Sequence, residues 1–197
     1  MRYPPDHKRQ TKKALLEAAA EALRREGPHR LGVARVMADA GLTHGGFYAH
    51  FPSRDALIAA GIGQMFEESR DRLPAVSPDR SAADNLARFI DQYLSTQHRD
   101  ARGGGCPLPF LANDAPRLSA AARQQFARGV RGLTDRFAAL LSGIGQPEPE
   151  AEAASALSEM VGALTLARAE PDPDRSNRIL EISRSRLRKR FGLETRS

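Results

Sequence analysis

The chain has 197 residues, of which 41% are hydrophobic, so it can bury a core as one sizeable domain or two small ones. Its 30 Lys and Arg against 24 Asp and Glu give a net charge of +6, which favours a polyanionic partner. No apolar run approaches the roughly 20 residues that span a bilayer, the N-terminus lacks the apolar core of a signal peptide, and one cysteine excludes an internal disulfide. We therefore expect a cytoplasmic protein without a membrane segment.

The first predicted element is an amphipathic helix over residues 7–26. Leu15, Ala18, Ala22 and Leu23 recur along one helical face, and the Gly-Pro pair at residues 27–28 ends the pattern. Basic residues gather in this helix, whereas residues 146–174 are mainly acidic; the basic ones are Lys8, Arg9, Lys12 and Lys13. Such a cluster suits contacts with phosphate groups.

Residues 33–55 predict two short helices, a turn between them and the start of a third helix. Gly41 stands where a helix ends with a residue at positive φ, and Thr43 can cap the next helix. That helix would bury Phe47 and Phe51 at i, i+4. Ser53 can cap the third helix. Two short helices joined by a glycine-containing turn make a helix-turn-helix.

Two glycines, Gly45 and Gly46, lie inside the second short helix. Each should cost about 1 kcal/mol relative to alanine in a helix interior. That cost is explained if the backbone must approach something bulky, such as base edges in a major groove. The alternative is that this segment is a loop, in which glycines need no explanation.

Helical periodicity continues through the remainder of the chain, and strand-like alternation is absent, which predicts an all-α fold. We expect a helix from residue 54 to about 73, a linker over 74–78, a helix over 86–94 and a flexible glycine-rich loop over 102–107. A short apolar element over 108–112 and a long helix over 115–141 follow. Two last helices contain Leu157 to Leu164 and Ile179 to Phe191.

Residues 41–57 resemble the DNA-binding signature of TetR-type transcriptional regulators. The ordered run of Phe47, Tyr48, His50, Phe51 and Ser53, followed by a basic residue, is more specific than a generic helix-turn-helix. The resemblance is firm from about residue 8 to 62 and looser beyond. It implies that residues 45–46 are helical and that the chain has about nine helices. It also implies a DNA-binding domain over 1–53 and a ligand-binding and dimerisation domain over 54–197.

The expected DNA contacts form two groups. Thr43, Tyr48, His50 and Arg54 carry donors suited to phosphate oxygens, and matching positions do this work in the family. Residues 44–46, which are His44, Gly45 and Gly46, lie in the first turn of the recognition helix, the part that reaches base edges. Two alternatives remain open: Tyr48 partly buried beside Phe47, and His50 a solvated surface histidine.

Cys106 is the second candidate site. It follows three glycines and precedes Pro107, a residue favoured at the first helical position, so a helix dipole there would lower the pKa of the thiol. This segment resembles the sensor segment of TetR-type repressors that respond to electrophiles, quinones and reactive chlorine. The alternative is a small buried residue that lines a ligand pocket.

Apolar side chains that could line a regulatory pocket are Met65, Phe66, Phe89, Tyr93, Phe110 and Phe126. The alternative is that they belong to the core, where aromatic residues at helical spacing are more often found. The two last helices could form a homodimer bundle, with Gly162 and Ala163 allowing a close helix approach, or could pack within one chain.

The sequence thus predicts a homodimeric DNA-binding regulator, most simply a repressor that a ligand or electrophile releases from a palindromic operator. A helical binding protein that has lost DNA binding is one alternative. A Cys106-dependent enzyme is another, but only His98 lies near Cys106 in sequence and no catalytic motif surrounds it. No P-loop, GxGxxG or metal-spaced cluster is present, so we expect no enzyme activity, cofactor or metal.

Overall fold

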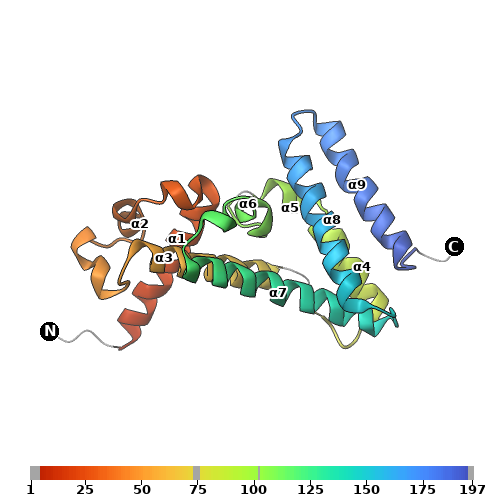
Figure 1. Ribbon diagram of the computed structural model, residues 1–197, viewed down its shortest axis with the longest axis horizontal. Coiled ribbons are helices and arrows are strands. Elements are labelled where there is room, and N and C mark those ends of the chain that lie inside the picture. The colour runs from red at the N-terminus through yellow and green to blue at the C-terminus, as the bar shows by residue number, and fades with distance from the viewer. Residues whose placement is uncertain (1–4, 73–75, 102, 195–197) are drawn as a thin grey trace. The chain divides into compact units, whose positions relative to one another are not determined.

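The computed structural model describes residues 5–72, 76–101 and 103–194, and no strand occurs among them (Figure 1). The predicted all-α class is confirmed. Contacts divide the chain into two units, one of Met1–Glu68 with Phe110–Gly129 and one of Ser69–Pro109 with Val130–Ser197. The expected domain boundary between residues 53 and 54 therefore falls inside the first unit. That residues 1–53 form a separate DNA-binding domain stays a prediction.

Four helical segments begin the first unit: α1 (Pro5–Arg30), α2 (Val33–Asp39), the 3₁₀ helix η1 (His44–Ala49) and α3 (Arg54–Arg72). Gly27, at φ 77°, interrupts α1 where the sequence predicts its end. Gly41 has φ 71° and forms the turn after α2, as predicted. Because glycine adopts positive φ without a Cβ clash, Gly27 can form the break inside α1 and Gly41 the turn that follows α2.

A continuous apolar core joins the helices of the first unit. Its largest members come from all four segments: Leu15, Leu23, Met37, Phe47, Phe51, Leu57, Ile62 and Met65. Gly61 lets α1 and α3 touch, since a Cβ there would lie 2.8 Å from Leu23 Cδ1 and 3.2 Å from Ala19 Cβ. This glycine serves close packing.

The segment from residue 110 to 129 also belongs to the first unit, and the elements around it begin at residue 108. These elements are α6 (Leu108–Leu111), the 3₁₀ helix η2 (Ala115–Arg117) and the start of α7 (Ala120–Gly143). The sequence predicts α7 from residue 115, five residues too early. Pro116 has no N–H for an α-helical bond, and regular bonding begins where the Arg123 N–H donates to the Ser119 carbonyl at 2.9 Å.

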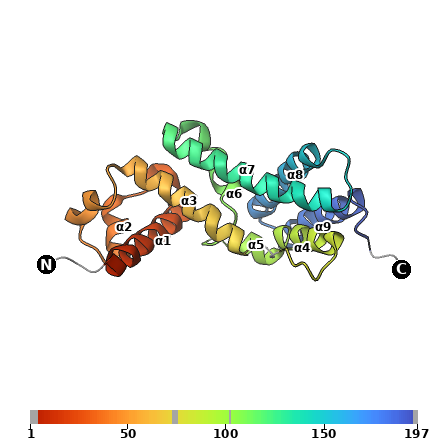
Figure 2. The same ribbon diagram turned by 90° about the horizontal axis from the view of Figure 1, so that it is seen from below.

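The second unit contains α4 (Ala82–Tyr93), α5 (Thr96–Asp100), α8 (Pro149–Ala169) and α9 (Pro173–Arg190). Helices α8 and α9 lie side by side in both views (Figures 1 and 2). The side chains at the centre of this unit are Leu86, Phe89, Ile90, Tyr93, Phe137, Leu141, Met160, Leu164 and Leu187. Two residues of the expected linker, Pro74 and Ala75, lie outside the described residues.

Two large apolar side chains on the last two helices remain exposed. Leu166 on α8 is 62% exposed, and Ile182 on α9 is 53% exposed. Within the described ranges, no helix is both long enough and apolar enough to cross a membrane.

Candidate nucleic-acid interface and cysteine cavity

The expected recognition helix is present as a 3₁₀ helix, η1. Thr43 has the extended backbone of an N-cap, at φ −80° and ψ 145°, but its side chain makes no capping bond. Instead its carbonyl accepts the Gly46 N–H at 3.1 Å. Thr43 therefore stands at the predicted N-cap position, but the predicted hydrogen bond from its side chain does not form. Ser53 does cap α3, because its hydroxyl accepts the Ala56 N–H at 3.1 Å.

One face of η1 is exposed while the opposite face is anchored in the core. Phe47 is buried and stacks on Phe51, with ring centroids 6.2 Å apart. Tyr48 meets Phe47 only edge-on and is 76% exposed, so partial burial does not explain this tyrosine. Thr43 and His44 are also exposed, and His50 is half-buried. The side chains expected to contact DNA, apart from Arg54, thus lie on η1 or at its ends.

Neither glycine of η1 is required by the packing of the unit itself. A Cβ at Gly45 would meet nothing within 4 Å, and one at Gly46 would make an ordinary contact with Met37 at 3.7 Å. The packing of the described residues therefore gives no reason for glycine at position 45, and an approach of its backbone to DNA stays a prediction.

Arg54 has a structural role that the sequence did not indicate. Its Nε donates to the Leu31 carbonyl at 2.9 Å, and its Nη2 donates to the carbonyls of Pro28 at 2.6 Å and His29 at 3.0 Å. These carbonyls lie at the end of α1 and just beyond it, where the helix itself supplies no donors. Arg54 therefore ties α1 to the start of α3, and its contact with phosphate stays a prediction.

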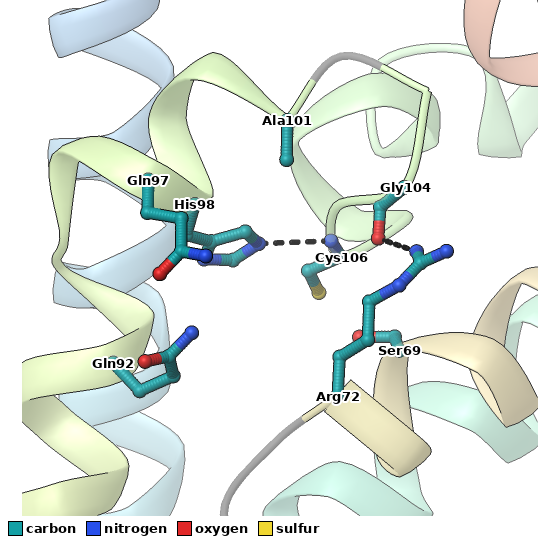
Figure 3. Close-up of a pocket in the computed structure, with 8 residues that line it drawn as sticks. All are labelled: Ser69, Arg72, Gln92, Gln97, His98, Ala101, Gly104 and Cys106. Carbon is teal, nitrogen blue, oxygen red and sulfur yellow. Dashed lines mark hydrogen bonds between the residues drawn. The ribbon is translucent and has the colours of Figure 1, made fainter.

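A cavity of about 220 Å³ lies in the second unit beside Cys106 (Figure 3). Ser69 and Arg72 come from the end of α3, Gln92 from α4 and Gln97 from α5. The remaining lining residues are His98, Ala101, Gly104 and Cys106. Cys106 is 1% exposed, and its sulfur points into the cavity.

His98 holds the Cys106 backbone in place. The Cys106 N–H donates to His98 Nε2 at 2.9 Å, so this nitrogen carries no proton. The proton is then on Nδ1, which donates to the Tyr93 carbonyl at 2.8 Å. Burial lowers the pKa of His98, and the charges of Arg168 and Arg72 lower it further. A neutral His98 in one tautomer thus fixes the loop before α6 against α4.

The expected activation of the Cys106 thiol is wrong for this structure. Burial raises the pKa of Cys106, although Tyr93, the Leu108 N–H, Ser69 and the charge of Arg168 act in the opposite direction. Helix α6 spans only Leu108–Leu111, too short for the full dipole on which the prediction relied, and desolvation of the thiolate is the larger effect.

The glycines before Cys106 serve close packing around two arginines. A Cβ at Gly105 would lie 2.8 Å from Arg168 Nη2, and one at Gly104 would overlap the guanidinium of Arg72. Arg72 Nη1 donates to the Gly104 carbonyl. The predicted flexible loop is therefore a backbone segment packed against cationic side chains, although Arg102 of that prediction lies outside the described residues.

The apolar pocket expected from the sequence does not form around the cavity. Met65, Phe66, Phe110 and Phe126 belong to the core of the first unit, and Phe89 and Tyr93 stack inside the second with ring centroids 6.4 Å apart. None of the six lines the cavity beside Cys106. The alternative interpretation as core residues accounts for them.

Comparison with known proteins finds a family model that matches the helix-turn-helix and solved structures with a similar fold. Residues 15–60 match the model of bacterial regulatory proteins, tetR family. The crystal structure of E. coli NemR in its reduced form is similar with a TM-score of 0.79 and 21% identity, over 91% of this chain and 95% of that one. The structure of a TetR transcriptional regulator from Chloroflexus aurantiacus J-10-fl is similar with a TM-score of 0.78 and 22% identity, over 95% of this chain and 96% of that one.

A further solved structure, a TetR-family transcriptional regulator from a Rhodococcus species, has a TM-score of 0.76 and 20% identity, over 94% of this chain and 98% of that one. No curated protein sequence matches the chain. At these identities the similarity to solved structures establishes the fold alone, and the match to the family model covers residues 15–60.

Proposed function

We propose that this chain is a TetR-family transcriptional regulator, as the family match at residues 15–60 supports, and that it binds a palindromic operator as a homodimer in the cytoplasm. We further propose that it is a repressor, released when a small molecule occupies or modifies the cavity beside Cys106. The observation that carries the first proposal is the exposed face of η1, with His44, Gly45 and Tyr48 outward and Phe47 anchored in the core.

A homodimer follows from how little DNA one short helix can read. Two recognition elements spaced about 34–36 Å apart enter successive major grooves on one face of the duplex. Exposed Leu166 and Ile182, on two helices that lie side by side, supply an apolar surface that a second copy would cover. Gly162 on α8 has nothing within 4 Å of a built Cβ, so a partner helix could approach closely there.

Replacing His44 by alanine tests the assignment of base contacts. We expect a loss of about 1–3 kcal/mol on the selected operator and little change on random DNA, because a base contact discriminates sequence while phosphate contacts do not. Titration of both duplexes at the same salt concentration measures the difference. Equal losses on the two duplexes would remove His44 from the set of base contacts. No binding of either duplex by the unmodified protein would favour the alternative, a helical protein without DNA binding.

Release through the cavity is supported by the direction of the Cys106 sulfur, which faces the space that an inducer would occupy. One similar structure, that of NemR, is described as a reduced form; here we propose that modification of the Cys106 thiol controls DNA binding. The raised pKa of Cys106 means that such a modification would be slow at neutral pH and faster as pH rises.

The variant Cys106→Ser distinguishes release by covalent modification of Cys106 from release by a small molecule that only occupies the cavity. After treatment with iodoacetamide, the original protein should release its operator, and Cys106→Ser should stay bound because no other cysteine is present. Release should also become faster with rising pH through and above about 8.5, the ordinary pKa of a thiol. Equal release of both proteins would count against covalent control through Cys106, and a rate that levels off below pH 8 would contradict the raised pKa of the thiol.

A further inference from the structure

We propose that the cavity beside Cys106 is a receptor for small organic anions, such as a short-chain or single-ring carboxylate, with Arg72 as the group that binds the negative charge. This inference rests on the proposed function in so far as it names the ligand class of the proposed inducer site. The side chains of the cavity carry it.

The described lining of the cavity carries positive charge and no carboxylate. Among the described residues that line the cavity, Arg72 is cationic and none carries a carboxylate. A second guanidinium, that of Arg168, packs against Gly105 at the back of the same loop and is held by the carbonyls of His98 at 2.9 Å and Arg99 at 3.0 Å. Both arginines lower the pKa of His98, which is the effect of a positive potential at this wall.

The polar groups of the lining can bind oxygen atoms. Arg72, Gln92 and Gln97 supply N–H donors from three different helices; the amides of Gln92 and Gln97 face the cavity from one side, and the guanidinium of Arg72 lies at the Gly104 carbonyl on the other (Figure 3). Behind the wall, the hydroxyl of the fully buried Tyr93 lies beside the Cys106 thiol, and its hydrogen bond to the sulfur lowers the pKa of Cys106 in opposition to burial.

The size of the cavity limits the ligand. Its volume of about 220 Å³ lies below the roughly 300–1,000 Å³ of pockets for drug-sized ligands. This volume fits a small carboxylate better than a drug-sized apolar molecule. Guanidinium groups bind carboxylates through paired N–H donors, and in the free protein Arg72 satisfies one donor with the Gly104 carbonyl, which a carboxylate would replace.

Two reagents of nearly equal shape and different charge test the proposal at the single cysteine. Iodoacetate and iodoacetamide both alkylate the thiolate: the S–C bond forms, iodide leaves with the C–I electron pair, and the thiol proton goes to solvent. The ratio of the two rate constants at one pH cancels the thiolate fraction. Relative to 2-mercaptoethanol, a neutral free thiol, we expect Cys106 to favour iodoacetate about fivefold, as for a unit charge about 4 Å away in a water-like medium.

The variants Arg72→Gln and Arg72→Lys decide whether Arg72 is responsible. The ratio should fall to that of the free thiol in Arg72→Gln and persist in Arg72→Lys. It should also persist in Arg70→Gln, which removes an exposed arginine on the same helix that does not line the cavity. A ratio at or below the free-thiol value, an equal loss in Arg70→Gln, or no reaction with either reagent would overturn the proposal. Because no DNA is used, these outcomes are independent of the test of operator binding.

Discussion

Replacing Glu68 by glutamine is expected to lower the free energy of unfolding by about 3–5 kcal/mol, because a buried arginine then loses the carboxylate that neutralises it. The Arg24 side chain is 2% exposed, and its Nη2 lies 2.7 Å from Glu68 Oε2. The same nitrogen donates to the Met65 carbonyl at 3.5 Å. This pair joins α1 to α3 inside the first unit, so its loss should be seen in urea unfolding followed by circular dichroism.

Two controls separate the buried pair from a general charge effect. Glu17→Gln removes the carboxylate of an exposed i, i+4 pair with Lys13, and it should cost less than about 0.5 kcal/mol. The double variant Arg24→Met with Glu68→Leu removes both charges and should recover most of the lost stability. If Glu68→Gln is no more destabilising than Glu17→Gln, the buried pair does not stabilise this unit.

Replacing Gly45 by alanine is expected to weaken operator binding by about 1–3 kcal/mol, the usual cost of inserting a methyl group into a well-packed contact. The same change should leave the stability of the protein unchanged or higher. A Cβ at this position meets nothing within 4 Å in the chain, and alanine favours helical backbone over glycine. Operator titration and thermal unfolding on the same preparation measure the two effects.

Gly132→Ala is the matched control for Gly45. It lies on α7, is exposed, and also has open space around a built Cβ, so alanine there should leave DNA affinity unchanged and, as at Gly45, should keep or raise stability, by up to about 1 kcal/mol. An operator affinity for Gly45→Ala equal to that of Gly132→Ala would show that the DNA does not approach the backbone of η1 at this residue.

The helix-turn-helix could be predicted because its signals are local. Gly41 marks a turn, Phe47 and Phe51 mark a buried face, and Ser53 marks a helix start, all within a few residues of one another. The role of Arg54 could not, because its acceptors lie at residues 28–31 and only the fold brings them to its guanidinium. A charged residue beside a DNA-binding motif is equally compatible with both roles.

The lining of the cavity could not be predicted from the sequence for a different reason. Its lining comes from three separate segments, residues 69–72, 92–101 and 104–106, and the side chains involved are polar ones with no periodic pattern. The sequence instead indicated aromatic residues, which pack in two cores. The sign of the Cys106 pKa shift was also missed, because burial depends on tertiary packing while the dipole argument uses only the adjacent helix.

The central claim is that this chain reads a two-fold symmetric operator, and selection of DNA tests it most directly. The purified protein is mixed with sheared genomic DNA from its own source, and the fragments it retains at physiological salt are sequenced. We predict one inverted-repeat motif whose half-site centres are about one helical turn, or a whole multiple of it, apart, and which His44→Ala no longer enriches. Retention of fragments with no shared motif, or of a motif without two-fold symmetry, would contradict the account.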